Sequence, residues 1–171
     1  MRSIAFVFQT SKLFKTSIFE NVKMGNKDAS DEDVMNALRL ARCEDILAKF
    51  PEREKTVIGS KGVHLSGGEI QRVAIARAIL KNADIIILDE ASAAADPENE
   101  YEIQQAFSNL MKNKTVIMIA HRLSSIKNVD EILVVEDGNI VERGSDAELM
   151  QKGGKYSRLQ KLYSQANEWR V

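Results

Sequence analysis

Residues 85–90 read Ile-Ile-Ile-Leu-Asp-Glu, a continuous apolar run that ends in two acids. Such a run is typical of a strand that is buried on both faces of a parallel sheet. The acids then follow at the carboxyl end of the strand, where open α/β sheets bind their ligands. Asp89 suits Mg²⁺, bound directly or through water, and Glu90 suits the polarisation of an attacking water. Two acids in an exposed loop after a strand are the alternative interpretation.

Two other stretches predict strands, Ile4–Phe8 and Thr115–Ala120. Helical patterns separate the strands, and they are expected at Ser17–Met24, after the N-cap Ser30, at Glu44–Lys49, from Gly68 to about Lys81, and from Asp96-Pro97 onwards. Strands that alternate with helices predict an α/β fold with a mainly parallel sheet. Because the stretch from about 16 to 80 is nearly all helix, we expect a single domain over 1–171, in which a helical subdomain is inserted into an α/β core made of 1–15 and 81–171 with its C-terminal helices.

An antiparallel hairpin is expected near the C-terminus, at the edge of the sheet. Glu131–Glu136 and Asn139–Arg143 have strand character, and Asp137-Gly138 between them is a tight-turn signal. A helix then begins at a capping box formed by Ser145 and Glu148, and a last helix follows it.

The stretch Leu65-Ser66-Gly67-Gly68-Glu69 has the composition of an anion site. Ser66 suits the N-cap of the following helix, and Glu69, three residues on, completes a capping box. Gly67 and Gly68 carry no side chains, so that a ligand can approach the backbone N–H groups closely. A helix N-terminus with bare amides and a hydroxyl binds anions. The alternative is an ordinary capped helix after a turn.

Polar residues also follow the other two predicted strands. His121 comes after Thr115–Ala120 and can donate a hydrogen bond to a terminal phosphate, although a histidine taken alone is more often structural. Gln9 ends Ile4–Phe8 and offers an amide to a metal or a water, which taken alone indicates almost nothing. Because parallel strands end at the same edge, we expect Gln9, the acid pair and His121 to line one rim, shaped for a magnesium-bound triphosphate.

The composition excludes several classes of protein. Lys and Arg number 24 against 25 Asp and Glu, a net charge of −1, so no general attraction to nucleic acid or anionic lipid is expected. No apolar run approaches the roughly 18–20 residues that span a bilayer, and the N-terminus has no signal-peptide layout. A single cysteine excludes an intrachain disulfide and fits a reducing cytosol. Any link to a membrane is therefore expected to come through a partner.

In combination and in order, these motifs resemble the ATP-binding cassette (ABC) ATPase family over nearly the whole chain. Residues 65–69 resemble the signature motif of the family, with Glu69 in place of the usual glutamine, and 71–78 match the helix after it. Ile85–Glu90 resembles the Walker B strand with its catalytic glutamate. The remaining positions resemble the Q-loop at Gln9, the D-loop at Ala91–Asp96 and the switch histidine at His121.

The resemblance implies an incomplete P-loop ATPase fold, the C-terminal portion of an exporter-type cassette. The segment 56–62 is similar to the loop with which exporters contact their transmembrane domains. Such cassettes work as head-to-tail dimers, in which each ATP lies between the P-loop of one subunit and the signature helix of the other. The implied ligands are therefore ATP and Mg²⁺. The implied roles are catalysis by Glu90 and His121, metal binding by Asp89 and Gln9, and nucleotide binding by Gln9, Ser66, Gly67, Gly68, Glu69 and Asp96.

The implied activity is ATP hydrolysis coupled to transmembrane transport. The implied location is the cytoplasm, peripheral at the inner face of the cell membrane. The expected partners are the transmembrane domains of an ABC transporter and a second ABC ATPase domain, of the same or a different chain, and no nucleic acid is expected.

Three departures from the family pattern bear on these expectations. The P-loop motif Gly-x-x-x-x-Gly-Lys-[Ser/Thr] is absent, and the only Gly-Lys pair is Gly154-Lys155, followed by a tyrosine. We therefore expect an N-terminally truncated cassette that binds ATP negligibly and is inactive alone. Its uncovered sheet edges and apolar faces predict poor solubility or dimerisation. Ala93 and Ala95 alter the D-loop, and Glu69 adds a negative charge near the phosphates, to be weighed against its capping role.

Two other functions stay open. One is a soluble ABC-type ATPase that acts on nucleic acid or ribosomes, but such proteins insert long coiled coils or duplicate the cassette, and this sequence has neither. The other is a non-catalytic fragment whose signature helix caps a P-loop supplied by another chain. A P-loop and transmembrane helices in frame upstream of Met1 would single out the exporter.

Overall fold

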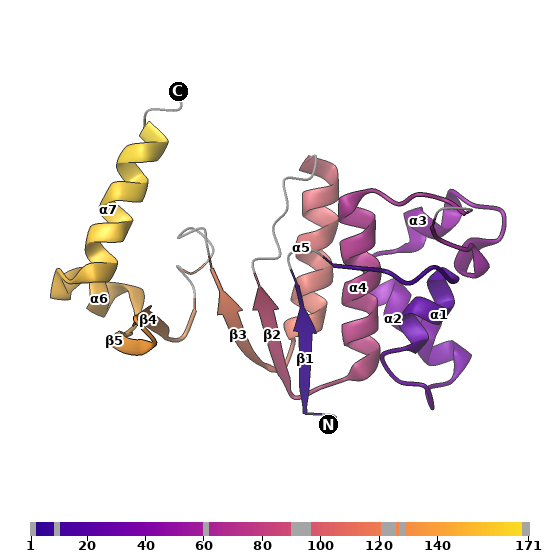
Figure 1. Cartoon of the computed structure of the whole chain (residues 1–171), viewed down its shortest axis with the longest axis horizontal. Coiled ribbons are helices and arrows are strands. Elements are labelled where there is room, and N and C mark those ends of the chain that lie inside the picture. Colours follow the sequence, from indigo (N-terminus) through magenta and orange to yellow (C-terminus); the bar gives the residue numbers. More distant parts are fainter. Residues whose placement is uncertain are drawn as a thin grey trace. The chain divides into compact units, whose positions relative to one another are not determined.

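The computed structural model describes residues 3–8, 11–59, 62–89, 97–120, 126 and 129–168. The chain divides into two compact units, Met1–Ile119 and Ala120–Val171 (Figure 1). The first unit holds a parallel sheet with most of the helices, and the second holds a hairpin with two helices. Within the described ranges, no helix combines the length and the apolar character needed to cross a membrane.

Three parallel strands form the sheet of the first unit. In the order in which they lie side by side, they are β1 (Ile4–Val7), β2 (Ile85–Asp89) and β3 (Thr115–Ile119). Val7 pairs with Leu88, and Asp89 pairs with Ile119, so that the three carboxyl ends meet at one edge. The predicted α/β fold with a parallel sheet is confirmed in this unit.

Helices occupy most of the chain between β1 and β3. They are α1 (Ile18–Lys23), α2 (Asp31–Leu40), α3 (Glu44–Ala48), the 3-10 helix η1 (Arg53–Lys55), α4 (Gly67–Lys81) and α5 (Pro97–Met111). The side-chain oxygens of Ser17, Ser30 and Ser66 cap α1, α2 and α4, which explains where these helices begin. Because α4 contacts β1 as well as α1, α2 and α5, the division of this unit into a helical subdomain and an α/β core stays a prediction.

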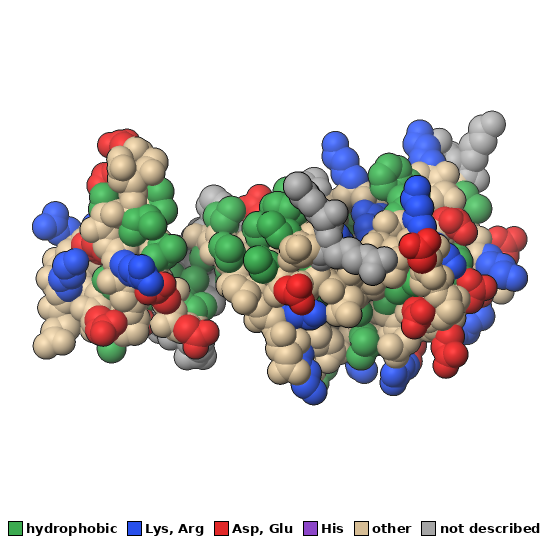
Figure 2. All heavy atoms as spheres, turned by 90° about the horizontal axis from the view of Figure 1, so that it is seen from below, with side chains coloured by type: hydrophobic (Ala, Val, Ile, Leu, Met, Phe, Trp, Pro, Cys, Tyr) green, Lys and Arg blue, Asp and Glu red, His purple; other side chains and the backbone are tan. Residues whose placement is uncertain are grey.

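Among the described residues of the first unit, helices cover only one face of the sheet. Alternate residues point toward the helices and are buried in the main core, namely Ala5, Val7, Ile86 and Leu88. The opposite face exposes 51–55% of each of four large side chains, namely Phe6, Phe8, Ile117 and Ile119. Hydrophobic side chains accordingly gather at the surface of this unit in Figure 2.

The expected burial of the strand Ile85–Leu88 on both faces is therefore wrong. Ile86 and Leu88 are buried, whereas Ile85 and Ile87 are half-buried. The neighbouring strands shield these two residues from the sides, and no described element of this unit covers them. This finding agrees with the expectation of an uncovered apolar face.

A hairpin and two helices form the second unit, namely β4 (Ile132–Glu136), β5 (Asn139–Gly144), α6 (Asp146–Lys152) and α7 (Lys155–Glu168). The hairpin is confirmed, but β4 and β5 form a two-stranded antiparallel sheet of their own. Asp137 and Gly138 connect them with positive φ angles of 48° and 77°, as a two-residue type I′ turn requires.

Two carboxylates hold the helices of the second unit. Glu148 closes the predicted capping box of α6 with Ser145. Glu142 on β5 accepts hydrogen bonds from the backbone N–H groups of Lys155 and Tyr156, over 2.6 and 2.9 Å. These bonds satisfy donors that the first turn of α7 leaves free, and they attach the helix to the hairpin.

A buried guanidinium joins α3 to α4 in the first unit. Arg72, in the second turn of α4, is 1% exposed. Its terminal nitrogens donate to the two carboxylate oxygens of Asp45, each over 2.8 Å. They also donate to the backbone carbonyl of Arg42 and to the side-chain oxygen of Asn99. Since a buried charge is tolerated only when it is paired, these contacts place α3 against the start of α4.

Removal of the Asp45 carboxylate is expected to destabilise the first unit. Asp45→Ala leaves the buried charge of Arg72 without its bidentate partner, so the free energy of unfolding should fall by about 2–3 kcal/mol. Urea denaturation followed by circular dichroism measures the change. Glu44→Ala, at the adjacent exposed residue of α3, is the matched control and should cost less than about 0.5 kcal/mol. Equal stabilities of the two variants would contradict the assigned role.

The uncovered sheet face is expected to bind apolar probes and to promote self-association. Replacing Phe6 and Ile117 together by serine removes two of its large side chains and should roughly halve the fluorescence of bound anilinonaphthalene sulfonate. Sedimentation velocity should show less oligomer. Tyr101→Ser, at a residue of α5 that is 61% exposed, is the control and should change neither readout. A wild-type chain that is monodisperse, monomeric and free of dye binding would count against this expectation.

Candidate functional site

The carboxyl edge of the three-stranded sheet is the first candidate site. Asp89 is the last residue of β2 and pairs with Ile119 at the end of β3. Because paired residues of parallel strands share a face, the Asp89 side chain lies on the uncovered face of the sheet, where it is half-buried. A carboxylate oxygen in this position suits a hard cation such as Mg²⁺.

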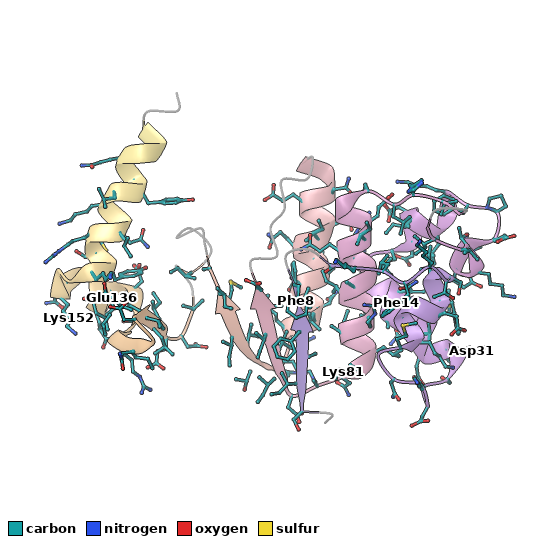
Figure 3. All side chains as sticks on the ribbon, viewed as in Figure 1. Phe8, Phe14, Asp31, Lys81, Glu136 and Lys152 are labelled. Carbon is teal, nitrogen blue, oxygen red and sulfur yellow. The ribbon has the colours of Figure 1, made fainter. Side chains whose placement is uncertain are left out.

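Four of the predicted site residues lie outside the described residues, namely Gln9, Glu90, Asp96 and His121. Phe8 (labelled in Figure 3), Asp89 and Ala120 directly precede three of them and stand at the ends of adjacent strands. The structure therefore brings together the strand ends from which these residues follow. The contacts of their side chains stay a prediction.

The metal site rests on the chemistry of one described residue. In the part of the chain that the structure describes, no cluster of three or more His, Cys, Asp or Glu side chains could hold a metal ion. Asp89 by itself has the hard oxygen donor that Mg²⁺ prefers. The predicted second ligand, Gln9, lies outside the described residues, so the metal site stays a prediction.

The N-terminus of α4 is the second candidate site, and its predicted capping box is confirmed. The Glu69 backbone N–H donates to Ser66 Oγ over 3.3 Å, and the Ser66 backbone N–H donates to Glu69 Oε2 over 2.7 Å. The two residues thereby satisfy two of the backbone donors at the helix start. The remaining N–H groups of the first turn and the positive end of the helix dipole favour an anion.

The two glycines at the start of α4 have different surroundings. A Cβ on Gly67 would meet no atom within 4 Å, so the backbone is open to a ligand there. A Cβ on Gly68 would lie 3.3 Å from Ile103 Cδ1 and 3.4 Å from Asn99 Cβ, both on α5. The missing side chain of Gly68 therefore allows the close packing of α4 on α5, whereas Gly67 faces open space, and the approach of a ligand to both glycines stays a prediction.

The charge of Glu69 is compensated inside the protein. Its side chain is 8% exposed, and Oε1 lies 2.5 Å from the ammonium nitrogen of Lys49. Burial alone would raise the pKa of Glu69, but the hydrogen bonds from Lys49 and from the Ser66 backbone outweigh it and lower this pKa below its ordinary value. The carboxylate is thus ionised, and its two oxygens accept hydrogen bonds from Lys49 at the end of α3 and from the backbone of Ser66.

A second set of contacts, which the sequence did not indicate, holds the segment after Gln9. The buried Asn21 side chain accepts from the Phe14 backbone N–H over 2.8 Å and donates to the Phe14 carbonyl over 3.0 Å. Arg77 of α4 donates to Asn21 Oδ1 over 2.9 Å, and its guanidinium lies 5.6 Å from the centre of the Phe14 ring (labelled in Figure 3). The approach to the sheet edge is therefore attached to the same helix whose N-terminus forms the second site.

The loop 56–63 also pairs with the chain before α1. The Ile18 backbone N–H donates to the Thr56 carbonyl, and the Ile58 backbone N–H donates to the Thr16 carbonyl, each over 3.0 Å. Beside these bonds, Val57 is 50% exposed and Phe14 is 58% exposed. Hydrogen bonds thus join the segment at Val57 to the segment that follows Phe14, and each segment exposes an apolar side chain.

Comparison with known proteins identifies the family. The sequence model of the family described as ABC transporter matches residues 1–93. An ATP-dependent lipid A-core flippase of Chromobacterium violaceum is 46% identical over 93% of this chain and 27% of its own length. A beta-(1→2)glucan export ATP-binding/permease protein of Bartonella henselae is 44% identical over 96% of this chain and 28% of its own length.

A eukaryotic relative gives the same result. ABC transporter B family member 4 of Dictyostelium discoideum is 47% identical over 91% of this chain. The chain spans only 20–28% of the length of these three relatives. Because the family model covers more than half of the 171 residues and the relatives align with nearly all of them, the chain belongs to the ABC transporter family.

Proposed function

We propose that this chain is part of the ATPase domain of an ABC exporter, where it couples ATP hydrolysis to transport across a membrane. The observation that carries the proposal is the in-register ending of β1, β2 and β3, with Asp89 at the shared edge. Members of this family have the P-loop ATPase fold, and two of the relatives are named as an exporter and a flippase. The parallel three-stranded sheet agrees with that fold.

The sheet edge supplies the metal and hydrolysis groups in this proposal. Asp89 and Gln9 bind Mg²⁺, which when bound neutralises charge on the phosphate oxygens. Glu90 accepts a proton from the attacking water and orients it, and His121 donates a hydrogen bond to the terminal phosphate. The half-buried position of Asp89 supports its part of this assignment.

The start of α4 acts on a nucleotide that a second ATPase domain holds by its P-loop. The Ser66 hydroxyl and the open backbone at Gly67 bind the terminal phosphate. Gly68 packs against α5, and Glu69 accepts from the Ser66 backbone N–H, so that both residues hold the helix start in place. Asp96 contributes to the contact between the two domains. The second ATPase domain is therefore required for turnover. It belongs either to a second copy of this chain or to a different chain.

The apolar surface around Phe14 and Val57 contacts the transmembrane domains in this proposal. Its side chains are exposed, and hydrogen bonds between the two segments hold them together. Since the segment at Phe14 follows Gln9 and is attached to α4 through Arg77, a displacement there reaches both candidate sites. The protein then lies in the cytoplasm, peripheral at the inner face of the cell membrane.

The chain alone is expected to have negligible affinity for ATP. The sequence has no P-loop, whose amides and lysine supply most of the grip on phosphates, so that the acids at the sheet edge face a polyanion with little compensation. Isothermal titration calorimetry with Mg-ATP should detect no micromolar binding. A complete ABC ATPase domain titrated under the same conditions is the positive control. Micromolar binding by the chain alone would contradict this part of the proposal.

A composite site should restore activity and should depend on Ser66. The full chain is mixed with a P-loop-bearing ABC ATPase domain whose own signature serine is replaced by alanine, so that hydrolysis requires the signature helix of this chain. Ser66→Ala should lower the ATPase rate of the mixture on the order of 10-fold to 100-fold, because it removes a donor to the transferring phosphate.

The matched control for this loss is Ser145→Ala. It opens the equivalent capping box of α6 in the second unit, which costs about 1 kcal/mol of helix stability without touching either candidate site. The rate with Ser145→Ala should stay near that of the wild-type mixture. Equal rates for the wild type and Ser66→Ala would show that the signature helix is not used.

A further inference from the structure

Two ion pairs join α3 to the first two turns of α4. Lys49, at the C-cap of α3, pairs with Glu69, and Asp45, one turn earlier, pairs with Arg72. The four residues, which we call the charge quartet (Asp45, Lys49, Glu69 and Arg72), alternate in sign across the two helices. Arg72 donates two hydrogen bonds to Asp45. The Glu69 carboxylate is instead paired with the ammonium of Lys49, which neutralises its charge.

Both oxygens of Glu69 are occupied in this arrangement. Oε1 accepts from Lys49 over 2.5 Å, and Oε2 accepts from the Ser66 backbone N–H over 2.7 Å. The Lys49 side chain is 54% exposed, whereas that of Glu69 is 8% exposed. The Glu69 carboxylate therefore contacts the start of its own helix through Ser66, and the more exposed ammonium of Lys49 lies between this carboxylate and the solvent.

An unpaired carboxylate at this place would oppose the binding of phosphates. Glu69 lies in the first turn of α4, next to the open backbone at Gly67. A negative charge there cancels the partial positive charge of the helix N-terminus, which is the feature that attracts an anion. If Lys49 did not hold Oε1, the side chain would also be free to leave Ser66 and turn toward an incoming phosphate.

We propose that Lys49 is a positioning residue for nucleotide turnover at the composite site, because it neutralises Glu69 and keeps that carboxylate on Ser66, so that the start of α4 stays open to the terminal phosphate of a nucleoside triphosphate. The inference rests on the proposed function of the signature helix. Lys49 acts through Glu69 and does not touch the nucleotide itself.

A double-mutant cycle in the composite ATPase assay tests this role. The variants are Lys49→Met, Glu69→Gln and their combination, each in the full chain mixed with the P-loop-bearing domain. Lys49→Met should raise the KM for ATP roughly tenfold, because it leaves a charged group facing the phosphates. In the combined variant, the KM should return to within about twofold of that of Glu69→Gln alone, because no charge is left to compensate.

Two controls separate this role from a general effect. Lys27→Met removes an exposed lysine of the same unit and matches the change in net charge, so the KM should not change. Lys49→Arg keeps the cation and should retain most of the wild-type KM. Thermal denaturation of each variant shows whether the fold is kept.

Each result decides between the claims. A raised KM in Lys49→Met that Glu69→Gln rescues supports the inference. A raised KM without rescue, or a wild-type KM in Lys49→Met, overturns the inference when Ser66→Ala still lowers the ATPase rate as expected. If Ser66→Ala has no effect, the proposed function of the signature helix fails first, and the inference fails with it.

Discussion

The buried guanidinium of Arg72 is the constraint that organises the first unit. A fully buried positive charge has to be paired, and its partners come from α3, from the turn before α3 and from α5. These elements are therefore held around the second turn of α4. The same packing brings Lys49 to Glu69 and leaves only a tight space beside α5 at Gly68, so the geometry of the helix start depends on this desolvated group.

Local features of this chain could be predicted from the sequence because their causes are local. A serine followed three residues later by a glutamate marks the start of α4 and α6, and both predicted capping boxes form. The expected N-cap Ser30 begins α2, where it also forms a capping box with Asp33. The type I′ turn at Asp137-Gly138 is also a short-range signal. The parallel order of the strands followed from their alternation with helices, and the family followed from the spacing of the motifs.

Features that depend on distant contacts could not be predicted. Lys49 is 20 residues from Glu69, and Arg77 is 56 residues from Asn21, and no periodicity or motif relates these positions. The one-sided burial of β2 was missed because an unbroken run of isoleucines looks the same whether one or both faces are covered. For Gln9, Glu90 and His121, the described strand ends support their convergence, and the side-chain roles of these residues and of Asp96 stay proposals.

The position of Asp89 links the solvent exposure of the uncovered sheet face to the chemistry of the sheet edge. Its carboxylate shares the bare face with Phe6 and Ile117, so any layer that packs over those side chains also displaces bulk water from beside the acid. In a drier setting, the attraction between a carboxylate and a divalent ion becomes stronger. Cation affinity at Asp89 and the covering of this sheet face should therefore increase together.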